Sequence, residues 1–600
     1  MDKKTIIGFI LIALFGFGFM YFSNPAGLNN PPAPPPIAND TATPLPEEAS
    51  PLSPTAPVAA LNENIPHQII RAETDLFEIE FSTLGATINS LRLKNYLDNG
   101  QPLEMVLRGH QENDGAFLIF FRPDNLGVPF YGNFVFTDRG NGIYEFSSHG
   151  YVRQNNDDVP FILTKTYEFK PGEYLFRLEV AFTQPDGQFL PLNFNGASYT
   201  LQAVPQIGPT FTQIDNRNVF RHNVYLNDGR RRQINLRNGF ASVDERVGWA
   251  GINEKYFAFI GVPDHSSYRQ IWTDIPVSGL EQGNQFSFVR STIRSSAQAD
   301  TFYFYVGPRL EQYLNRYNNA NNNAFGVSGF DLGRVMDQSA FLWPLERFLT
   351  WLLRLFYGLV GNWGFSILLV TLLIRIALFP LSLKGMLSAA RMSELQPKLK
   401  EIQERFKGQP QELQKATMQL YQKEGVNPMA GCFPLLLQMP ILFAMFGIFN
   451  RYFDFRHAPF LGWITDLSAP DQIATLPFTI PIFIGSAIRL LPVFYVLTQL
   501  LMNKIMQASQ PMQNPSMKMM MNLMPIIFFF VLYDMPSGLL LYWTFSNILA
   551  LVQQLIINWL KKSGRIKPPK PKKGFMARLM EQANANAKAQ NKIAPTRKKR

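Results

Sequence analysis

The sequence predicts a multi-domain membrane protein: an α-helical transmembrane bundle of six spans, an all-β domain and a helical hairpin outside the membrane. Three observations predict this class. The 600 residues are 46% hydrophobic overall, but the apolar residues gather in two zones that flank a polar middle. The polar middle shows the period-two alternation of β-strands. The second apolar zone contains runs long enough to cross a bilayer, and one of them carries an arginine, Arg375.

The apolar pattern of residues 1–23 predicts an N-terminal transmembrane anchor. The run from Thr5 to Phe22 contains no charge and follows Lys3 and Lys4. A cleavable signal peptide is the alternative, but the run exceeds the usual apolar region of a signal and no small-x-small triplet ends it. The two lysines place the N-terminus in the cytoplasm, so the next domain lies across the membrane.

Residues 24–64 are rich in Pro, Ala, Thr and Ser and predict an extended linker. Residues 65–330 predict a mostly antiparallel β-sandwich. Phe77, Ile79 and Phe81 alternate with glutamates, and the turn signal Lys170–Glu173 separates two further alternating strands. No metal set or nucleophile-base pair can be assembled from the spacing. We therefore expect a scaffold without enzymatic activity or cofactor; an envelope enzyme acting on glycan is the alternative.

Residues 331–560 predict the membrane core. Val335 to Leu355 has the pattern of an interfacial amphipathic helix. The next apolar run contains Arg375 at membrane depth, where a guanidinium needs water, a carboxylate, a carbonyl or a headgroup as partner. Arg375 could reach the headgroups by snorkelling along the helix, or it could lie in a hydrated cavity inside the bundle.

Residues 384–427 predict a helical hairpin. Leu395, Leu399, Ile402 and Phe406 recur at helical spacing, and Gly408-Gln409-Pro410 breaks the helix. Eight Lys and Arg side chains in this stretch place it in the cytoplasm. These charges fit a solvated face, and a docking surface for a partner is the alternative.

Four more apolar runs bring the number of predicted spans to six. The stretch from Phe478 to Ile488 is ambiguous between a loop and a span, and we assign it to the outer side because a seventh span would move the basic tail out of the cytoplasm. The four runs are Pro428–Phe449, Leu490–Gln507, Lys518–Tyr533 and Gly538–Leu560.

The tail, residues 561–600, contains fourteen Lys and Arg and the single acid Glu581, and the whole chain has a net charge of +11. Such a tail is attracted to anionic lipid headgroups or to RNA phosphate. The only cysteine, Cys432, lies in an apolar run, which excludes a disulfide or a cysteine-based zinc site within one chain.

Polar residues inside the apolar runs predict a hydrophilic groove around Arg375. Thr371 lies one helical turn from Arg375 on the same face. Amides occur in other runs, and no intramembrane Asp or Glu is available to neutralise the arginine. Hydrogen bonding between helices is the alternative role for each amide. The polar residues of the last run are Thr544, Asn547, Gln554 and Asn558, with Trp543 at the edge; those of the other runs are Gln438, Gln499 and Asn503.

The groove suits transient binding of a polar or acidic peptide segment. The lack of intramembrane Asp, Glu or His, the residues of proton relays, argues against an ion-coupled transporter. A small-anion transporter or channel with Arg375 as its selectivity charge stays open. Methionines near one membrane edge would fit varied apolar partners, or they would simply fill the core: Met502, Met506, Met512, Met517, Met519, Met520, Met521 and Met524.

Several segments closely resemble the YidC/Oxa/Alb family of membrane protein insertases, in its Gram-negative form. In the β region they are FSTLGATINSLRL from Phe81 and GWAGINEKYFAF from Gly248. In the membrane core they are NWGFSI from Asn362, Pro380-Leu381 after Arg375, Gln396-Pro397, Asn427-Pro428, GCFPLLLQMP from Gly431, PSGLLLYW from Pro536, and Ser546-Asn547.

The resemblance implies a cell inner membrane protein with both termini in the cytoplasm. It implies a periplasmic β-super-sandwich similar to sugar mutarotases, without known catalysis, and a five-helix insertase core. Arg375 matches the family's groove arginine, and Thr371 and the pair Tyr542-Trp543 match substrate-contacting positions, although family members often have Tyr in place of Trp543. With the polar residues above, the expected groove comprises Arg375, Thr371, Gln438, Tyr542, Trp543, Asn547 and Gln554.

The function implied by the resemblance is insertion and folding of inner-membrane proteins, alone or with the Sec translocon. The implied partners are nascent membrane proteins, the translocon with its accessory subunits, and membrane lipids. The basic tail resembles versions proposed to touch ribosomes, and the cytoplasmic hairpin is the expected contact for the signal-recognition-particle pathway. No GxxxxGK[ST] motif occurs in the sequence, which fits a process without nucleotide hydrolysis.

Overall fold

The structure is a computed structural model and divides into two compact units, residues 1–337 and 338–600, which we treat separately. The predicted anchor, most of the linker and the basic tail lie outside the described residues. The structure describes residues 58–60, 65–98, 100–107, 115–121, 128–154, 157–187, 190–204, 207–208, 221–236, 239–264, 267–273, 285–293, 299–336, 342–424, 433–480, 485–509 and 515–563.

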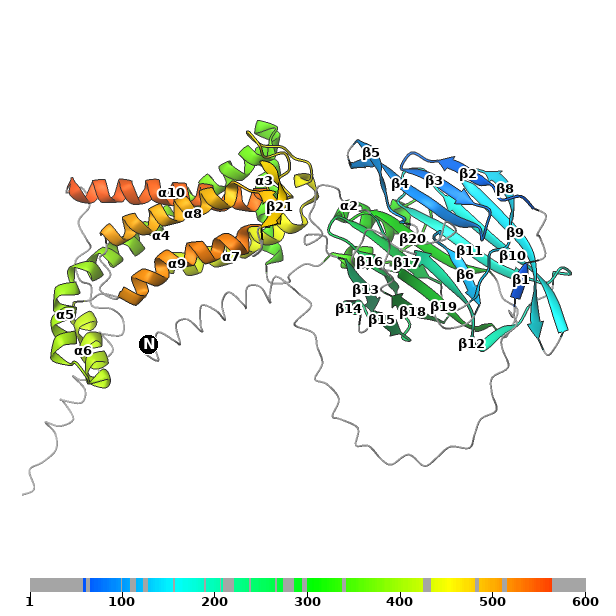
Figure 1. The fold of residues 1–600 in the computed structure, drawn as a ribbon, viewed down its shortest axis with the longest axis horizontal. Coiled ribbons are helices and arrows are strands. Elements are labelled where there is room, and N and C mark those ends of the chain that lie inside the picture. The colour runs from blue at the N-terminus through cyan, green and yellow to red at the C-terminus, as the bar shows by residue number, and fades with distance from the viewer. Residues whose placement is uncertain are drawn as a thin grey trace, which may run out of the picture. The chain divides into compact units, whose positions relative to one another are not determined.

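The first unit consists of three antiparallel sheets (Figure 1). The 10-stranded sheet has the order β1-β9-β10-β11-β20-β17-β16-β13-β14, with β8 also on β9. Its strands are β1 Val58–Ala60, β8 Val135–Gly140, β9 Ile143–Gln154, β10 Asp157–Phe169, β11 Leu175–Thr183, β13 His222–Asn227, β14 Arg230–Ile234, β16 Trp249–Asn253, β17 Phe257–Pro263 and β20 Asp300–Pro308.

The other two sheets have six and four strands. The 6-stranded sheet runs β15 Phe240–Val243, β18 Tyr268–Thr273, β19 Gln285–Ile293, β12 Leu192–Val204, β6 Leu118–Phe121 and β7 Val128–Pro129. The 4-stranded sheet runs β2 Ile69–Glu73, β3 Phe77–Ser82, β4 Thr87–Asp98 and β5 Gln101–Glu104. Short helices follow β20: α2 Glu311–Leu314 and the 3-10 turns Asn315–Asn318, Ala320–Asn322 and Leu332–Val335.

Aromatic side chains form the core between the layers. The 4-stranded sheet packs on the large sheet through Phe81, whose ring centroid lies 5.2 Å from that of Tyr167. The 6-stranded sheet packs on the same sheet through Phe288, 5.6 Å from Phe302. Tyr167 and Phe302 both align with Leu178 of β11, so the two smaller sheets cover one face of the large sheet. This arrangement confirms the predicted β-sandwich.

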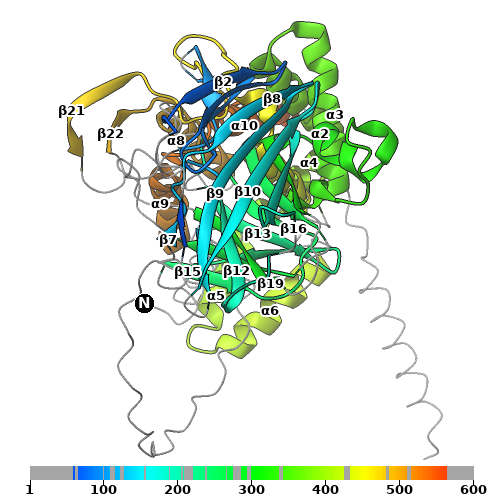
Figure 2. The same cartoon turned by 90° about the vertical axis from the view of Figure 1, so that its right-hand side faces the viewer.

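The predicted hairpin around Lys170–Glu173 is confirmed. β10 pairs with β11, with Phe169 opposite Phe176, and Gly172 has the positive φ of 73° that the tight turn requires. Figure 2 shows the long strands β9 and β10 side by side. Phe77, Ile79 and Phe81 are buried as the alternation predicts. A strand that covers a core is buried on one face only. This explains why the alternation of apolar and polar residues identified these strands.

A buried lysine organises the turns beneath the large sheet. Lys165 of β10 is fully buried, and its Nζ donates to the carbonyls of Phe117 at 2.6 Å, Gly85 at 2.7 Å and Ala86 at 3.3 Å. All three residues have positive φ, which is unusual for alanine and phenylalanine. Their turned carbonyls converge on one ammonium group, so Lys165 compensates a backbone conformation that would otherwise leave buried acceptors unpaired.

The second unit is helical (Figure 1). Its helices are α3 Trp343–Val360, α4 Trp363–Glu394, α5 Gln396–Arg405, α6 Pro410–Lys423, α7 Phe433–Arg451, α8 Leu491–Ser509, α9 Pro515–Leu532 and α10 Ser537–Lys562, with a 3-10 turn at Phe453–Phe455. α10 packs against α4, α7 and α8, and α9 packs against α8. Helix α4 continues through Pro380 as far as Glu394.

Two described segments are long and apolar enough to cross a membrane. They are Trp363–Leu383, with mean hydropathy 2.2, and Ser537–Leu560, with mean hydropathy 1.5. A shorter apolar stretch, Met521–Leu532, lies in α9. The six predicted spans therefore stay a prediction, since the described helices support two by length and composition.

The ambiguous stretch from Phe478 to Ile488 does not belong to a membrane-length helix. Its described residues, 478–480 and 485–488, belong to two strands that pair with each other and precede α8, β21 Ala474–Ile480 and β22 Gly485–Ile488. Asp471 accepts hydrogen bonds from the backbone N–H groups of Leu490 and Leu491, at 2.8 and 2.9 Å, and so caps the start of α8.

Two further predicted elements differ in their bounds. The interfacial helix predicted from Val335 begins at Trp343, since Val335 ends a 3-10 turn. The charged hairpin consists of α5 and α6, separated at the predicted break, with Lys398 bonded to Glu424 at 2.6 Å. Because α4 continues to Glu394, the hairpin helices begin later than residue 384.

The NWGFSI segment has a structural explanation. Asn362 caps α4, since its Oδ1 accepts from the N–H of Phe365 at 3.1 Å and its Nδ2 donates to the carbonyl of Pro459. At Gly364 an added Cβ would lie 2.0 Å from the ring of Phe460. Only glycine lets the start of α4 approach this loop so closely, so the motif fixes one end of the arginine-bearing helix.

We predict that Lys165→Met destabilises the β domain by about 2–4 kcal/mol, because buried carbonyls lose their donor. Burial lowers the pKa of Lys165 from 10.5 to about 7. The unfolded chain therefore binds this proton more tightly than the folded domain between those values, and wild-type stability rises with pH across that window. The variant should lack this rise. Urea unfolding of the full chain in detergent at several pH values measures both effects.

The control for this prediction is Lys94→Met. Lys94 pairs with Glu73 at the surface, where such ion pairs contribute less than about 1 kcal/mol. Hydrogen exchange of peptides around Gly85 and Lys165 should report the unfolding of the β domain in each variant. Equal losses in the two variants would contradict a special role for the buried lysine.

Candidate functional site

Arg375 lies deep in an apolar helix and is held by a neutral partner. It follows Trp363 by about 18 Å along α4 at ~1.5 Å per residue. Its Nη2 donates to the Ser546 carbonyl at 2.9 Å and to the Ser546 Oγ at 2.7 Å, on α10. No carboxylate of the described residues pairs with it. The positive charge is therefore anchored but not neutralised.

The rest of the guanidinium keeps unused donors. Arg375 is half-buried, and its Nε and Nη1 make no hydrogen bond within the described residues. Neither nitrogen is fully enclosed. A guanidinium offers five N–H groups in a fixed planar arrangement, so Arg375 can bind a further acceptor while it stays bonded to Ser546.

Two predicted residues flank this contact. Thr371 is 1% exposed, and its hydroxyl donates to the carbonyl of Ile367 in the same helix at 2.6 Å. Tyr542 is also 1% exposed, packs 6.3 Å from the ring of Phe449 and lies near Arg375. Thr371 therefore has a satisfied donor, and Tyr542 forms part of the packed core beside the arginine.

Helix α10 divides the predicted polar residues between two neighbouring faces. Tyr542 and Ser546 lie one turn apart on the face toward Arg375. Trp543, Asn547 and Gln554 follow a second stripe, and Trp543 packs on Tyr495 of α8 with 6.0 Å between ring centroids. The structure therefore brings Arg375 and Tyr542 together, and it turns Trp543 toward α8.

Four enclosed polar atoms of α10 have no hydrogen-bond partner among the described residues. They are Trp543 Nε1, Thr544 Oγ1, Asn547 Nδ2 and Gln553 Nε2. Gln554 differs, because its Nε2 donates to Asn558 at 3.0 Å. An unpaired polar group in a membrane helix is costly, and because all four atoms are enclosed, neither water nor another chain contacts them in this arrangement of the helices.

No described contact joins Gln438 to Arg375 or to the polar residues of α10. It lies half-buried on α7, which packs against α4 and α10. α7 is tied instead to α3, where Arg451 donates to both carboxylate oxygens of Glu346 at 2.9 Å. The structure thus leaves Gln438 outside the contacts that connect Arg375 with α10.

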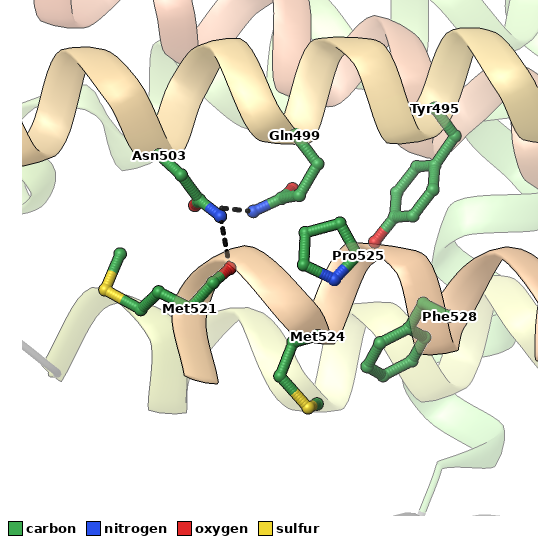
Figure 3. Close-up of a pocket in the computed structure, with 7 residues that line it drawn as sticks. All are labelled: Tyr495, Gln499, Asn503, Met521, Met524, Pro525 and Phe528. Carbon is green, nitrogen blue, oxygen red and sulfur yellow. Dashed lines mark hydrogen bonds between the residues drawn. The ribbon is translucent and has the colours of Figure 1, made fainter. Parts of the chain in front are cut away.

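A pocket of about 230 Å³ lies between α8 and α9 (Figure 3). Gln499 and Asn503 line it from α8, one turn apart as the sequence indicates, with 3.4 Å between their amide groups. Two of the predicted methionine cluster, Met521 and Met524, line it from α9. The remaining lining residues are Tyr495, Pro525 and Phe528.

Two features were missed from the predicted site. Ser546 was recognised only as part of a motif, and periodicity alone cannot reveal a bond between residues 171 positions apart. A signal existed, since Ser546 lies one turn after Tyr542. The α8–α9 pocket was missed as a unit, although the amide pair and the methionines that line it were each apparent in the sequence.

Comparisons with known proteins cover both units. A family model described as 60Kd inner membrane protein matches residues 355–564, and one described as YidC periplasmic domain matches residues 69–352. The protein named Membrane protein insertase YidC of Treponema denticola is 36% identical over 578 residues, covering 93% of this chain and 99% of that protein. The protein of the same name from Treponema pallidum is 35% identical over 522 residues, covering 81% and 84%.

Solved structures are less similar. A YidC insertase crystal structure with its first transmembrane domain resolved has a TM-score of 0.32 at 18% identity, covering 81% of this chain and 94% of that one. A galactose mutarotase-like protein from Lactobacillus casei has a TM-score of 0.29 at 13% identity, covering 40% of this chain and all of that one. Both scores are low, so neither likeness supports a statement about ligand or activity.

We predict that Asn547→Leu and Gln554→Leu differ in their effect on stability. Asn547 Nδ2 has no described partner, so its replacement should change the unfolding free energy by less than about 0.5 kcal/mol. Gln554→Leu removes the bond to Asn558 and should cost about 1 kcal/mol. Thermal unfolding in detergent compares the two. An equal loss in both would indicate that Asn547 is satisfied within the bundle.

Proposed function

The chain belongs to the YidC family of membrane protein insertases, and we propose that it inserts integral proteins into the inner membrane through a hydrophilic groove containing Arg375. We propose further that it helps these proteins fold, alone or with the Sec translocon. The observation that carries the proposal is the Arg375–Ser546 contact, which places an unneutralised charge inside an apolar helix.

In the proposed topology six spans cross the inner membrane and both termini lie in the cytoplasm. The spans are the anchor (residues 1–23), α4, α7, α8, α9 and α10. The hairpin of α5 and α6 and the tail (residues 561–600) then lie in the cytoplasm, and the β domain lies in the periplasm. The eight basic residues between 384 and 423 and the fourteen between 561 and 600 support this orientation through the positive-inside rule.

Arg375 would receive the polar segment of a client that must cross the membrane. Its Nε and Nη1 are available to a client carboxylate or carbonyl while Nη2 stays on Ser546. At about 4 Å and an effective dielectric near 20, attraction to a carboxylate is on the order of 4 kcal/mol. The neutral character of Ser546 matters, because a carboxylate bound to Arg375 within the bundle would compete with the client for this charge.

The unpaired atoms of α10 would extend the polar path from Arg375 toward α8. Trp543 Nε1 and Asn547 Nδ2, which are enclosed and unpaired in this structure, would donate to client carbonyls when a client separates α8 from α10. Thr371, Gln438 and Gln554 complete the proposed groove. Thr371 and Gln554 would act through their side-chain oxygen atoms, which can still accept hydrogen bonds. Such a groove shortens the apolar barrier that the client's polar segment must cross.

The apolar part of the client would leave sideways into the lipid along α7 and α9, the third and fifth proposed spans. Apolar burial contributes roughly 25 cal/mol per Å². Burial of the client helix and attraction of its acidic residues to Arg375 would together drive insertion without nucleotide hydrolysis.

The partners follow from this topology. Nascent membrane proteins are the clients, and membrane lipids surround the bundle. The Sec translocon with its accessory subunits, the ribosome at the basic tail, and the signal-recognition-particle pathway at the hairpin are proposed contacts. We propose that the β domain is a non-catalytic scaffold. Family membership favours insertion over a small-anion transporter.

We predict that a photo-cross-linker at Trp543 captures a nascent single-span protein stalled on the ribosome. Trp543 is half-buried at the edge of the proposed groove, so a client segment there should lie within reach. Cross-linked products are identified by their size and by antibodies against the client.

Ile548 is the matched control for this experiment. It lies on the same helix, is 39% exposed and points away from Trp543 by about 140°. A cross-linker there should capture mainly lipid while the client's polar segment crosses. Capture of lipid alone at Trp543, or of equal amounts of client at both positions, would count against the groove.

A further inference from the structure

Helix α9 contains a proline, Pro525, within its apolar stretch. Pro525 has no N–H, so it cannot donate to the carbonyl of Met521 one turn earlier, and its ring pushes that carbonyl away from the helix axis. Met521 and Pro525 lie within the apolar stretch Met521–Leu532. A backbone carbonyl left unpaired in such surroundings is costly, and another group has to satisfy it.

Asn503 of α8 supplies the missing donor. Its Nδ2 donates to the Met521 carbonyl at 2.6 Å, and its side chain is 5% exposed (Figure 3). Gln499 in turn donates to the Oδ1 of Asn503 at 3.4 Å, which orients the amide toward α9. The bond between Asn503 and Met521 thus replaces, across two helices, the bond that the proline removes within one.

We infer that Asn503 is a positioning residue that fixes α9 against α8 and thereby sets the width of the pocket between them. This bond lies at one end of the pocket, whose walls are formed by Tyr495 and Gln499 of α8 and by Met524 and Phe528 of α9 (Figure 3). Near the pocket, one hydrogen bond to the α9 backbone therefore determines how closely the two helices approach.

The consequence for insertion rests on the proposed function. α9 packs against α8 and presents Leu523, Ile526 and Ile527 outward, each more than a third exposed. If a client leaves along α9, the position of this helix sets the width of its exit. Asn503 would then fix the position of α9 without contacting the client.

A second polar contact between the same helices does not have this role. Gln507 donates to the Oδ1 of Asn522 at 3.1 Å, but both partners are side chains and the contact is exposed. Its loss leaves no backbone carbonyl without a donor, so it provides a matched control for the loss of the Asn503 bond.

The test is a double-variant cycle with Asn503→Ala and Pro525→Ala. In the chain that keeps the natural Pro525, Asn503→Ala leaves the Met521 carbonyl unpaired. In the Pro525→Ala chain, the new N–H at position 525 can bond that carbonyl, so Asn503→Ala should have little further effect. The full chain carries Cys432→Ser and spin labels on Leu497 of α8 and Leu523 of α9, which are 55% and 39% exposed. Their separation is measured by pulsed electron paramagnetic resonance.

In the chain that keeps Pro525, we expect Asn503→Ala to broaden the distance distribution and to shift it to longer distances. In the Pro525→Ala chain we expect neither change. Asn503→Gln, which keeps an amide donor, should restore part of the narrow distribution, and Gln507→Ala should leave it unchanged. An unchanged distribution in Asn503→Ala, or an equal change in the Pro525→Ala chain, would overturn the inference.

Insertion of a single-span client into liposomes provides a second measurement. Asn503→Ala should lower its rate about threefold, the factor that corresponds to an average hydrogen bond between membrane helices, and Pro525→Ala should remove that loss. If the wild-type chain inserts nothing, the proposed function fails, whereas the distance measurement still decides whether Asn503 fixes α9. A distance change without any change in rate would overturn the link to insertion.

Discussion

The helical unit depends on one contact, in which the Arg375 guanidinium is held by both oxygens of Ser546. A carboxylate partner would stabilise the charge more strongly and would also cancel it. A serine hydroxyl and a backbone carbonyl satisfy part of the guanidinium and leave its charge effective. The contact therefore joins α4 to α10 and at the same time keeps a cation available inside the bundle.

The surrounding packing fixes the two helices that make this contact. Asn362 caps α4, and Gly364 allows its close approach to Phe460. At the start of α10, an added Cβ on Gly538 would lie 2.9 Å from the carbonyl of Leu467, so that glycine also permits a close approach. α9 is held differently, by a side-chain bond to a carbonyl that Pro525 has freed. Close helix–loop contacts thus position the two helices that carry the charge, and a side-chain bond to the backbone positions the helix at the proposed exit.

The amino-acid pattern predicted those features that depend on local periodicity. Alternation found the strands around Phe81 because one face of each strand covers an aromatic core. Helical spacing found the polar stripe of α10, and the apolar run found Arg375. Family resemblance added Tyr542 and Trp543, which the structure places on neighbouring faces of one helix.

Features that depend on contacts between distant segments could not be predicted in this way. Ser546 meets Arg375 only once α4 and α10 are packed, and Lys165 meets the carbonyl of Gly85 only across two sheets. The sequence from Phe478 is ambiguous between a loop and a span, and its described residues belong to two strands that pair with each other. The helix bounds differ from the predicted hairpin start at residue 384, because α4 continues through Pro380 to Glu394.

The central claim is that a hydrated groove open to the cytoplasm surrounds Arg375, and thiol labelling at position 546 tests it most directly. Ser546→Cys in a Cys432→Ser background keeps the carbonyl that Arg375 binds. Val552→Cys on the same helix, 46% exposed, is the control for a lipid-facing position. A charged, membrane-impermeant reagent added to sealed vesicles should label position 546 from the cytoplasmic side only and should not label position 552. Labelling from the periplasmic side, or from neither side while a lipid-soluble maleimide reacts, would contradict the account.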